Sequence, residues 1–317
     1  MKKGLFVLAA LTACMALGGC NNKKKFTIGI CQLAPHPALD AATEGFKSEV
    51  IARLGEENVS FDLQNAAGEA NSCTTIVNSF VNKRVDLIMA NATPALQAAA
   101  NSTLTIPILG TSITEYGVAL GLENFDGKTG SNISGTSDLA PLDEQARMVK
   151  DNFPSAQKVG ILYCSAEANS KYQVDVVSAE LGKLGLQVEK MSFSDSNDIS
   201  SVLSAKADSI DVLYIPTDNT CANNASIIDS ICQQKNLPVV AGEEGICQGC
   251  GALTLSISYE NIGKKTGEMA ARILLDKEDV GQMKIEYDEH PVKKYNPVIC
   301  QRLGITPPAD YQAIEMQ

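Results

Sequence analysis

Histidine is scarce in this chain, with only His36 and His290 among its 317 residues. Sites that depend on histidine as a metal ligand or as an acid–base group therefore have little support. The sequence also lacks the Gly-x-Ser-x-Gly turn of hydrolases and the paired histidines of zinc proteases. A phosphate-binding loop is excluded because five residues separate Gly121 from Gly127, where that motif requires four. We expect neither an enzyme of these classes nor a bound metal or cofactor.

Basic residues are outnumbered, with 26 Lys and Arg against 37 Asp and Glu, which gives a formal net charge of −11. An acidic protein repels phosphate backbones, so we expect no nucleic-acid partner. Long apolar runs are also missing after the first residues. No later stretch approaches the roughly 18 consecutive apolar residues that indicate a membrane-spanning helix.

A basic start, Met1-Lys2-Lys3, precedes an apolar run over residues 4–16. This pattern is typical of a secretory signal peptide, and the run is too short for a membrane span of about 20 residues. It ends Leu17-Gly18-Gly19-Cys20, which resembles the bacterial lipobox, where the cysteine receives a diacylglyceryl group. The alternative is an ordinary signal peptide that happens to end near a cysteine.

The lipobox interpretation predicts a lipoprotein signal peptide over residues 1–19, a lipid on Cys20 and a polar tether over residues 20–25. Removal of the signal takes away Lys2 and Lys3, so the net charge changes from −11 to −13. The mature protein is then expected outside the cytoplasm, anchored to the cell membrane through Cys20.

Of ten cysteines, Cys14 lies in the signal and Cys20 is the lipidation site, which leaves eight. Their spacing is irregular, unlike a disulfide scaffold. The one close pair, Cys247-Gln-Gly-Cys250, is compatible with a redox pair, half of a zinc site, a loop disulfide or two free thiols. No second pair and no nearby histidine supports the zinc site. A hydrolytic or redox enzyme that uses Cys247 or Cys250 is a competing hypothesis.

Short apolar runs alternate with longer amphipathic segments from residue 26 onward. Predicted strands are 26–31, 59–63, 85–89 and 106–109, then 158–163, 187–191, 212–214 and 238–240, and predicted helices are 37–54, 69–82, 94–102, 141–152, 167–184, 199–207 and 222–235. Such alternation predicts parallel sheets covered by helices on both faces. About 290 residues exceed one typical core. The predicted fold is therefore α/β, with two doubly wound Rossmann-like lobes.

The polar stretch 126–137 separates the two series and is the expected first crossover between lobes. The segment 252–258, a helix over 259–275 and a strand over 284–287 are expected to return the chain to the first lobe and then to the second. This assigns residues 26–134 plus 252–280 to the first lobe, and residues 135–251 plus 281–317 to the second.

Open parallel sheets bind ligands at the carboxyl ends of their strands, and in a two-lobed protein these ends face one cleft. The loops after the predicted strands are rich in hydroxyl, amide and acidic groups, which suits a small zwitterion. The helix that starts near Thr93 would attract a carboxylate, and Asp218 or Glu243 would hold an ammonium group. Helix capping is the alternative for Thr93, Asp218 and Asn219, and a turn is the alternative for His36.

A set of ordered segments resembles the substrate-binding proteins of tryptophan/tyrosine-type ABC transporters. The resemblance spans nearly all of the mature chain and rests on Ile30-Cys31-Gln32-Leu33, His36-Pro37-Ala38-Leu39-Asp40, Glu44-Gly45-Phe46, Thr93-Pro94-Ala95, Pro107-Ile108-Leu109, Asn132-Ile133-Ser134-Gly135, Leu162-Tyr163, Glu167, Asn169-Ser170, Pro216-Thr217-Asp218-Asn219, Gly251-Ala252, Tyr259, Gly263 and Gly267.

This resemblance implies a type I periplasmic binding protein, with two lobes joined by a three-strand hinge that close on an amino acid, aromatic in this family. It implies an ABC permease and its ATPase as partners, and we expect a monomer. It also implies that the cleft is lined by Gln32, Thr93, Thr111, Ser112, Asn169, Ser170, Asp218, Asn219 and Glu243.

The chain departs from the family pattern at Thr114-Glu115-Tyr116, where a Thr-Asp-Pro stretch is usual, and at Cys164, where Asn is usual. Both departures are expected near the cleft, so they bear on the identity of the ligand. The alternative function is a sensor, in which the same lobes present their ligand status to a membrane kinase or chemoreceptor.

Overall fold

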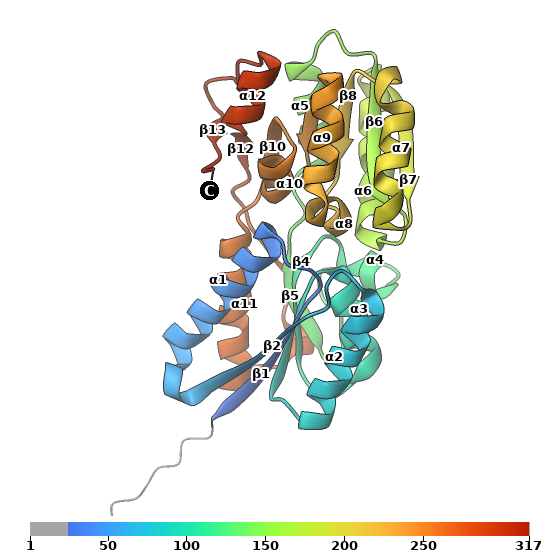
Figure 1. Cartoon of the computed structure of the whole chain (residues 1–317). Coiled ribbons are helices and arrows are strands. Elements are labelled where there is room, and N and C mark those ends of the chain that lie inside the picture. Colours follow the sequence, from blue (N-terminus) through green and yellow to red (C-terminus); the bar gives the residue numbers. More distant parts are fainter. Residues whose placement is uncertain (1–24, 317) are drawn as a thin grey trace, which may run out of the picture.

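The computed structural model describes residues 25–316. The predicted signal peptide (1–19), the lipidation site Cys20 and all of the tether except Lys25 lie outside the described residues. The chain forms two α/β lobes, one above the other in Figure 1, with the early strands in the lower lobe. None of the helices in residues 25–316 combines the length and apolarity that a bilayer span requires.

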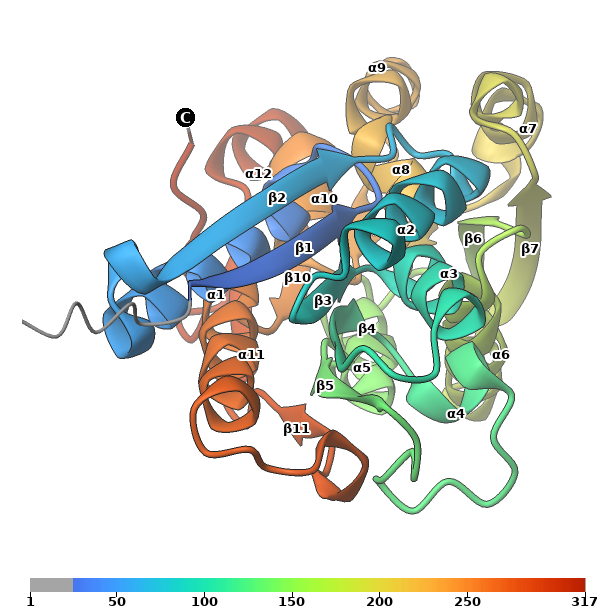
Figure 2. The same ribbon diagram turned by 90° about the horizontal axis from the view of Figure 1, so that it is seen from below.

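The first lobe contains a six-stranded sheet in the order β11-β5-β4-β3-β1-β2. Its strands are β1 (Phe26–Gln32), β2 (Val59–Asn65), β3 (Leu87–Asn91), β4 (Ile108–Ile113), β5 (Ile133–Ser137) and β11 (Glu286–Tyr287). Its helices are α1 (Pro37–Leu54), α2 (Ala70–Lys83), α3 (Thr93–Ser102), α4 (Tyr116–Leu120) and α11 (Tyr259–Leu274). Helices α1 and α11 cover one face of the sheet, while α2 and α3 cover the other (Figure 2).

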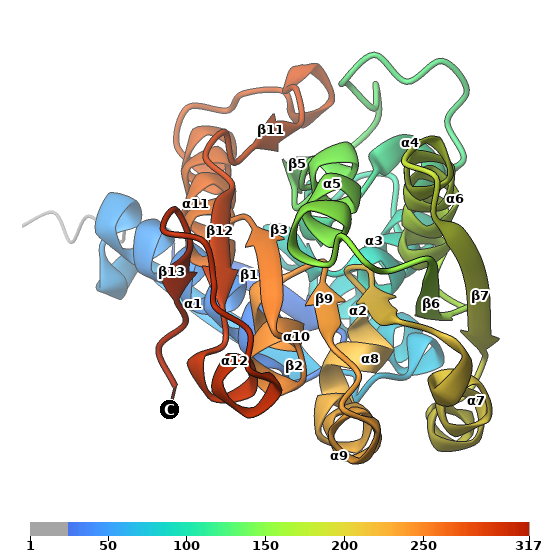
Figure 3. The same ribbon diagram turned by 90° about the horizontal axis from the view of Figure 1, so that it is seen from above.

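The second lobe contains a seven-stranded sheet in the order β13-β12-β10-β9-β8-β6-β7. Its strands are β6 (Lys158–Cys164), β7 (Gln187–Phe193), β8 (Val212–Ile215), β9 (Val239–Ala241), β10 (Leu253–Ser256), β12 (Val292–Tyr295) and β13 (Gln312–Ala313). Its helices are α5 (Leu142–Asn152), α6 (Ala168–Lys183), α7 (Ile199–Lys206), α8 (Asn219–Asn223), α9 (Ala225–Lys235), α10 (Glu244–Gly249) and α12 (Pro297–Leu303). Helices α5 and α6 lie on one side of the sheet, and α7 and α9 on the other (Figure 3).

Five consecutive parallel strands have the same order in each lobe, β2-β1-β3-β4-β5 in the first and β7-β6-β8-β9-β10 in the second. In both, the order reverses beside the first strand of the lobe, at β1/β3 and at β6/β8. Doubly wound sheets bind ligands at this switch point, beyond the carboxyl ends of the strands. The predicted α/β class with two doubly wound lobes is confirmed.

The chain crosses between the lobes three times, after β5, after β10 and after β11. The expected lobe boundaries need three corrections. Strand β5 lies wholly in the first sheet, although the predicted boundary falls after residue 134. β10 pairs with β9 and β12 in the second sheet, although residues 252–280 were assigned to the first lobe, and β11 pairs with β5 in the first sheet, although residues 281–317 were assigned to the second. A strand of two or four residues has the same local pattern in either sheet, so only its pairing decides its lobe.

Helices α1 and α11 approach closely because glycines lie at their contact. A Cβ atom on Gly45 would lie 2.3 Å from the carbonyl oxygen of Glu260, and one on Gly263 would lie 2.1 Å from that of Ala42. Any side chain at these positions would push the helices apart. Since the loop that begins α1 and the hinge segment that begins α11 both reach the interlobe cleft, this contact fixes their relative position.

Candidate ligand-binding site

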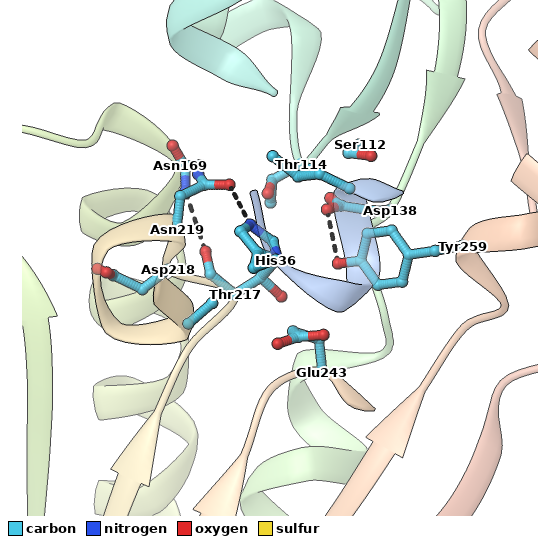
Figure 4. A pocket seen from close by; sticks show the side chains of 12 residues that line it. His36, Ser112, Thr114, Asp138, Asn169, Thr217, Asp218, Asn219, Glu243 and Tyr259 are labelled. Atoms are coloured by element: carbon cyan, nitrogen blue, oxygen red, sulfur yellow. Dashed lines mark hydrogen bonds between the residues drawn. The ribbon is translucent and has the colours of Figure 1, made fainter. Parts of the chain in front are cut away.

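A narrow cavity of about 10 Å³ lies between the lobes, so a ligand larger than a water molecule must move the side chains that line it. Both lobes line it at the carboxyl ends of their strands (Figure 4). The first lobe and the hinge provide His36, Leu39, Ser112, Thr114, Asp138 and Tyr259, and the second lobe provides Asn169, Thr217, Asp218, Asn219, Ala222 and Glu243.

Two adjacent strands of the first lobe end in strained residues, one of which, Ser112, lines the cavity. The register of β3 and β4 pairs Asn91 with Thr111, so the next residues, Ala92 and Ser112, are neighbours. Both have positive φ angles, 91° for Ala92 and 56° for Ser112, which non-glycine residues rarely adopt. Strain of this kind concentrates at ligand-binding sites. The hydroxyl of Ser112 is buried and has no hydrogen-bond partner in the part of the chain that the structure describes.

Helix α3 starts beside Ser112. Its N-cap residue is Ala92, which has no side chain that can accept from the first N–H groups of the helix. The N-terminus of a helix carries a partial positive charge, so α3 and the Ser112 hydroxyl together favour an anionic group.

Asp138 lies in the first crossover, directly after β5. Its side chain is 3% exposed, and its Oδ2 accepts a hydrogen bond of 3.0 Å from the Tyr259 hydroxyl. Its Oδ1 has no partner among residues 25–316. Burial raises the pKa of Asp138 to about 6, an effect that interactions with the Tyr259 and Thr114 side chains only partly offset. A buried carboxylate oxygen without a donor is suited to bind a cationic group.

Asp218, in contrast, is satisfied by its own lobe. Its Oδ2 accepts from the Cys164 amide and the Ser170 hydroxyl, both at 2.7 Å, and its Oδ1 accepts from the Cys221 amide at 2.8 Å. It is thereby the N-cap of α8. Burial and the charge of Glu167 raise its pKa to about 7. These contacts favour the helix-cap alternative for Asp218 over the expectation that it holds the ammonium group, because both of its oxygens accept hydrogen bonds from its own lobe.

Glu243 has the same structural role at α10. Its two carboxylate oxygens accept from the Ile246 and Gly245 amides at 2.5 and 2.6 Å. Burial raises its pKa to about 7. Glu243 therefore lines the cavity but directs its hydrogen bonds to its own helix.

Glu167 is a third buried acid of the second lobe and was not among the predicted site residues. Its Oε1 accepts from the amide and the hydroxyl of Thr220 at 2.9 and 2.8 Å. Its Oε2 accepts from the amide and the side-chain Nδ2 of Asn219 at 3.0 and 2.7 Å, and from Asn169 Nδ2 at 3.1 Å. Five donors thus converge on one carboxylate, which fixes the orientation of two asparagine amides at the cavity.

His36 reaches across the cleft to the second lobe. Its Nε2 lies 3.4 Å from Asn219 Oδ1, and its Nδ1 has no partner in the described ranges. Burial lowers the pKa of this imidazole, which favours the neutral form. The Asn219 Nδ2 group faces Glu167, so Asn219 Oδ1 is an acceptor and His36 Nε2 is the donor. His36 therefore lines the cavity in addition to preceding helix α1, so its role is not limited to a turn.

Five of the nine predicted site residues line the cavity, namely Ser112, Asn169, Asp218, Asn219 and Glu243. The other four lie close by without lining it. Gln32 donates to Ala34 in the loop after β1 and to Asp40 in α1, Ser170 donates to Asp218, and Thr111 contacts Thr136 inside the sheet. Thr93 is buried at the first turn of α3.

Sequence reasoning missed Asp138 and did not select Tyr259, Thr114 or Thr217. The polar stretch 126–137 predicts a crossover, whereas its end forms β5. Asp138 directly follows that strand, so the sequence pattern does not mark it as a residue at a strand end. Of the two departures from the family pattern, Glu115 caps α4 through the Val118 amide, and Cys164 donates its backbone N–H to Asp218.

All eight cysteines in residues 25–316 are free and buried. Burial raises the pKa of Cys247 and Cys250 well above the ordinary value, which disfavours the reactive thiolate. Within those residues no group of three or more His, Cys, Asp or Glu side chains has an arrangement that could hold a metal ion. Of the alternatives for the Cys247–Cys250 pair, two free thiols is the one observed.

Two doubly wound lobes with a cavity at their switch points define a two-lobed binding protein of the type I periplasmic class. The chain belongs to the family of ABC transporter substrate-binding proteins, whose family model matches residues 27–312. It is 35% identical over 282 residues to a tyrosine-binding protein of Clostridioides difficile (strain R20291), with 86% of this chain and 81% of that protein covered.

Solved structures of other substrate-binding proteins are also similar to this chain. An ABC domain in complex with L-Trp from Streptococcus pneumoniae has a TM-score of 0.87 at 28% identity, and covers 92% of this chain and 100% of that chain. A ligand-free, open structure of a substrate-binding protein with adhesive properties from Clostridium difficile has a TM-score of 0.70 at 36% identity, with the same coverage.

Family membership confirms that this is a binding protein and not an enzyme. Substrate-binding proteins of ABC transporters are extracytoplasmic, in agreement with the predicted location outside the cytoplasm.

Proposed function

We propose that this protein captures an aromatic amino acid in the interlobe cavity and delivers it to an ABC permease, which imports it with energy from a partner ATPase. One observation carries the ligand part of the proposal. Four polar atoms that are buried and unpartnered within residues 25–316 belong to residues that line this one cavity: Ser112 Oγ, Asp138 Oδ1, His36 Nδ1 and Asn169 Oδ1. Buried polar groups without partners are rare and destabilising, so a ligand that supplies the missing partners is favoured.

The α-carboxylate of the ligand is assigned to the first lobe. Ser112 Oγ is a free donor there, and the uncapped N-terminus of α3 lies beside it. The α-ammonium group is assigned to Asp138, whose Oδ1 lacks a donor. Ser112, Asp138 and Tyr259 lie on one side of the cavity in Figure 4, which places the two charged groups of an amino acid within one region.

The side chain of the ligand then extends toward the second lobe. His36 lies along this direction, and Asn169, Thr217 and Asn219 are at its far end (Figure 4). Leu39 also lines the cavity. An imidazole and an aliphatic side chain offer a flat, partly apolar surface for an aromatic ring.

The named ligands of the relatives support the aromatic class, since one is a tyrosine-binding protein and another was solved with L-Trp. Overall shape adds support. The chain has a higher TM-score with the L-Trp complex, 0.87 at 28% identity, than with the ligand-free open structure, 0.70 at 36% identity. A lower score at higher identity is expected when the lobes are arranged differently, which supports a lobe arrangement nearer to that of the L-Trp complex.

The proposal includes a lipid anchor on Cys20. Acyl chains on an N-terminal cysteine would hold the protein at the membrane surface, where the permease lies. Metabolic labelling with a clickable fatty acid is expected to label the wild-type protein and not the Cys20→Ala variant, which should accumulate as uncleaved precursor. Lipid labelling of that variant would exclude Cys20 as the site.

The binding function is tested by mass spectrometry of small molecules released from the protein after purification and denaturation, followed by calorimetry with L-Tyr, L-Trp and L-Phe. We expect an aromatic amino acid to be released, and at least one of the three to bind in a 1:1 ratio. Failure of all three to bind ligand-free protein would reject the aromatic class.

A further inference from the structure

Cys31 and Cys73 are cysteines of the first lobe whose thiols are in contact. Cys31 lies in β1 and Cys73 in α2, both are 0% exposed, and a hydrogen bond joins their side chains. The thiols of Cys247 and Cys300, in contrast, donate to backbone carbonyl oxygens of the second lobe. Cys31 and Cys73 therefore form a dithiol pair inside the first lobe.

The packing of α2 against β1 holds these side chains together. Residues 29 and 31 point to the same face of a strand, and residues 73 and 80 lie on the same face of a helix because about two turns separate them. The ring of Phe80 covers Gly29, where a Cβ atom would lie 2.6 Å from ring atoms. Since α2 runs back from the cleft along β1, this face also brings Cys73 to Cys31, and both belong to the same core cluster as Phe80.

Cys73 lies in the first turn of α2, and this turn is weakly held. The N-cap residue Glu69 makes no side-chain hydrogen bond to the helix, and residues 67–71 are exposed. Local opening of such a helix start exposes the thiol beneath it. The hydrogen bond from Cys31, together with a backbone amide at the helix start, lowers the pKa of Cys73. The same hydrogen bond and burial raise the pKa of Cys31.

Substrate-binding proteins of ABC transporters are extracytoplasmic, and disulfides form and persist in oxidising surroundings outside the cytoplasm. We propose that Cys31 and Cys73 form a reversible disulfide there, with Cys73 as the attacking thiol, and that this bond fastens the start of α2 to the end of β1. The loops beside the two cysteines, residues 33–34 and 67–70, line one groove between the lobes. The bond therefore holds the first-lobe side of that groove.

The oxidant is a second disulfide, from a small molecule or a thiol oxidoreductase. The Cys73 thiolate attacks one of its sulfur atoms, the sulfur–sulfur bond of the oxidant breaks, and one thiolate leaves. This thiolate takes the proton of Cys31, whose sulfur then attacks Cys73 Sγ and displaces the second thiolate. That thiolate takes up the proton that Cys73 lost. Two protein thiols thus become one disulfide, and two electrons and two protons convert the oxidant to two thiols.

The first test treats the mature protein with hydroxyethyl disulfide, a small neutral oxidant, then unfolds it and alkylates the remaining thiols with iodoacetamide. Of the eight thiols in residues 25–316, we expect Cys31 and Cys73 to escape alkylation and to be linked to each other in proteolytic fragments. Dithiothreitol should restore alkylation of all eight. Full alkylation after oxidation, or a disulfide that leaves Cys31 and Cys73 alkylated, would overturn the inference.

Two variants test the assigned order of attack by mass spectrometry. Cys31→Ala removes the thiol that resolves the mixed disulfide, so Cys73 should retain one hydroxyethylthio group from the oxidant. Cys73→Ala removes the attacking thiol, so Cys31 should stay unmodified. A loss of folding exposes either thiol alike, so it cannot produce this difference. Equal labelling of the two variants contradicts the role of Cys73.

Cys232→Ala is the matched control, since Cys232 is buried on α9 of the second lobe. It should form the disulfide as the wild type does. The bond closes a loop of about 40 residues, so oxidation should raise the melting temperature of the wild type and of Cys232→Ala by roughly 5–10 °C. Cys73→Ala should show no such shift. An unchanged melting temperature in the disulfide-bonded wild type would show that the bond does not fasten α2.

Discussion

Asp138 and Asp218 are both buried carboxylates at the edge of the same cavity, but their hydrogen bonds differ. Asp138 accepts from Tyr259 through Oδ2, while its Oδ1 is without a hydrogen-bond partner of good geometry among residues 25–316. Asp218 accepts three hydrogen bonds, from Cys164, Ser170 and Cys221. Only the first has an oxygen available to a ligand.

The difference follows from what comes next in the chain. Asp218 precedes the short helix α8, whose first N–H groups need an acceptor, and Glu243 precedes α10 in the same way. Asp138 is followed by a crossover, and α5 starts after Pro141 without any side-chain cap. An acid at the end of a strand is thus available for binding only where no helix requires it as a cap.

The largest effect on binding is expected from Asp138→Asn. The substitution keeps the shape of the side chain but removes the charge that pairs with the ligand ammonium. Charged hydrogen bonds contribute about 1.5–3 kcal/mol, so affinity for the aromatic ligand should fall roughly 10- to 100-fold or more. Calorimetry measures this, with Asp143→Asn as control, since Asp143 pairs with Arg147 on the exposed face of α5. An unchanged affinity would place the ammonium group elsewhere.

Asp218→Asn should lower stability and leave affinity almost unchanged, unlike Asp138→Asn. Three buried donors lose their ionised acceptor, so we expect the free energy of unfolding to fall by about 1–3 kcal/mol. Affinity per folded molecule should change by less than about threefold, or 0.6 kcal/mol. Urea denaturation and calorimetry on the same preparation separate the two. A large loss of affinity at unchanged stability would restore Asp218 as the ammonium partner.

The sequence predicted the α/β class because strand and helix periodicities are local. Helix α1 has the predicted bounds, since Pro37 begins it and Gly55, with a φ of 86°, ends it. The lobe assignment of β10 and β11 was not predictable in this way, because it depends on pairing with strands far away in the chain. The short helices α8 and α10 were missed because they contain too few residues to show a period.

Only part of the site was predictable, because the sequence reveals local patterns and not distant contacts. Polar residues at strand ends marked Ser112 and Asn169, which do line the cavity. The partners that use the oxygens of Asp218 include Cys164 and Ser170, which are 54 and 48 residues away. No local pattern reveals such bonds, so an acid that binds a ligand and one that caps a helix are alike in the sequence.

A pH titration tests the comparison between Asp138 and Asp218, because both carboxyl groups have raised pKa values. Burial raises the pKa of Asp138 from 3.8 to about 6 and that of Asp218 from 3.8 to about 7. At pH values between 3.8 and the raised pKa of each group, the folded protein retains protons that the unfolded chain releases. The free energy of unfolding should therefore fall as pH rises from about 4 to 7. Affinity should change in the opposite sense and weaken as pH falls below about 6, because Asp138 must be ionised to bind ammonium. Denaturation and calorimetry from pH 5 to 8 test both trends, and Asp138→Asn should remove the second.

The smallest effect is expected from a hydrogen bond between the two lobes, which joins His36 Nε2 and Asn219 Oδ1. At 3.4 Å it is long, and such bonds contribute about 0.5–1.5 kcal/mol at most. Asn219→Ala removes it but retains the backbone N–H that bonds Glu167. We expect a roughly 2- to 10-fold loss of affinity, because the bond forms only when the lobes are closed.

Small-angle scattering distinguishes this effect from a change in ligand contact. The ligand-free Asn219→Ala variant should be more expanded than the wild type, while both should compact to the same radius of gyration with saturating ligand. Asn223→Ala on the same helix is the matched control, because its side chain makes no hydrogen bond within residues 25–316 and does not line the cavity. Identical ligand-free profiles for wild type and Asn219→Ala, with affinity still reduced, would show that Asn219 acts on the ligand and not on closure.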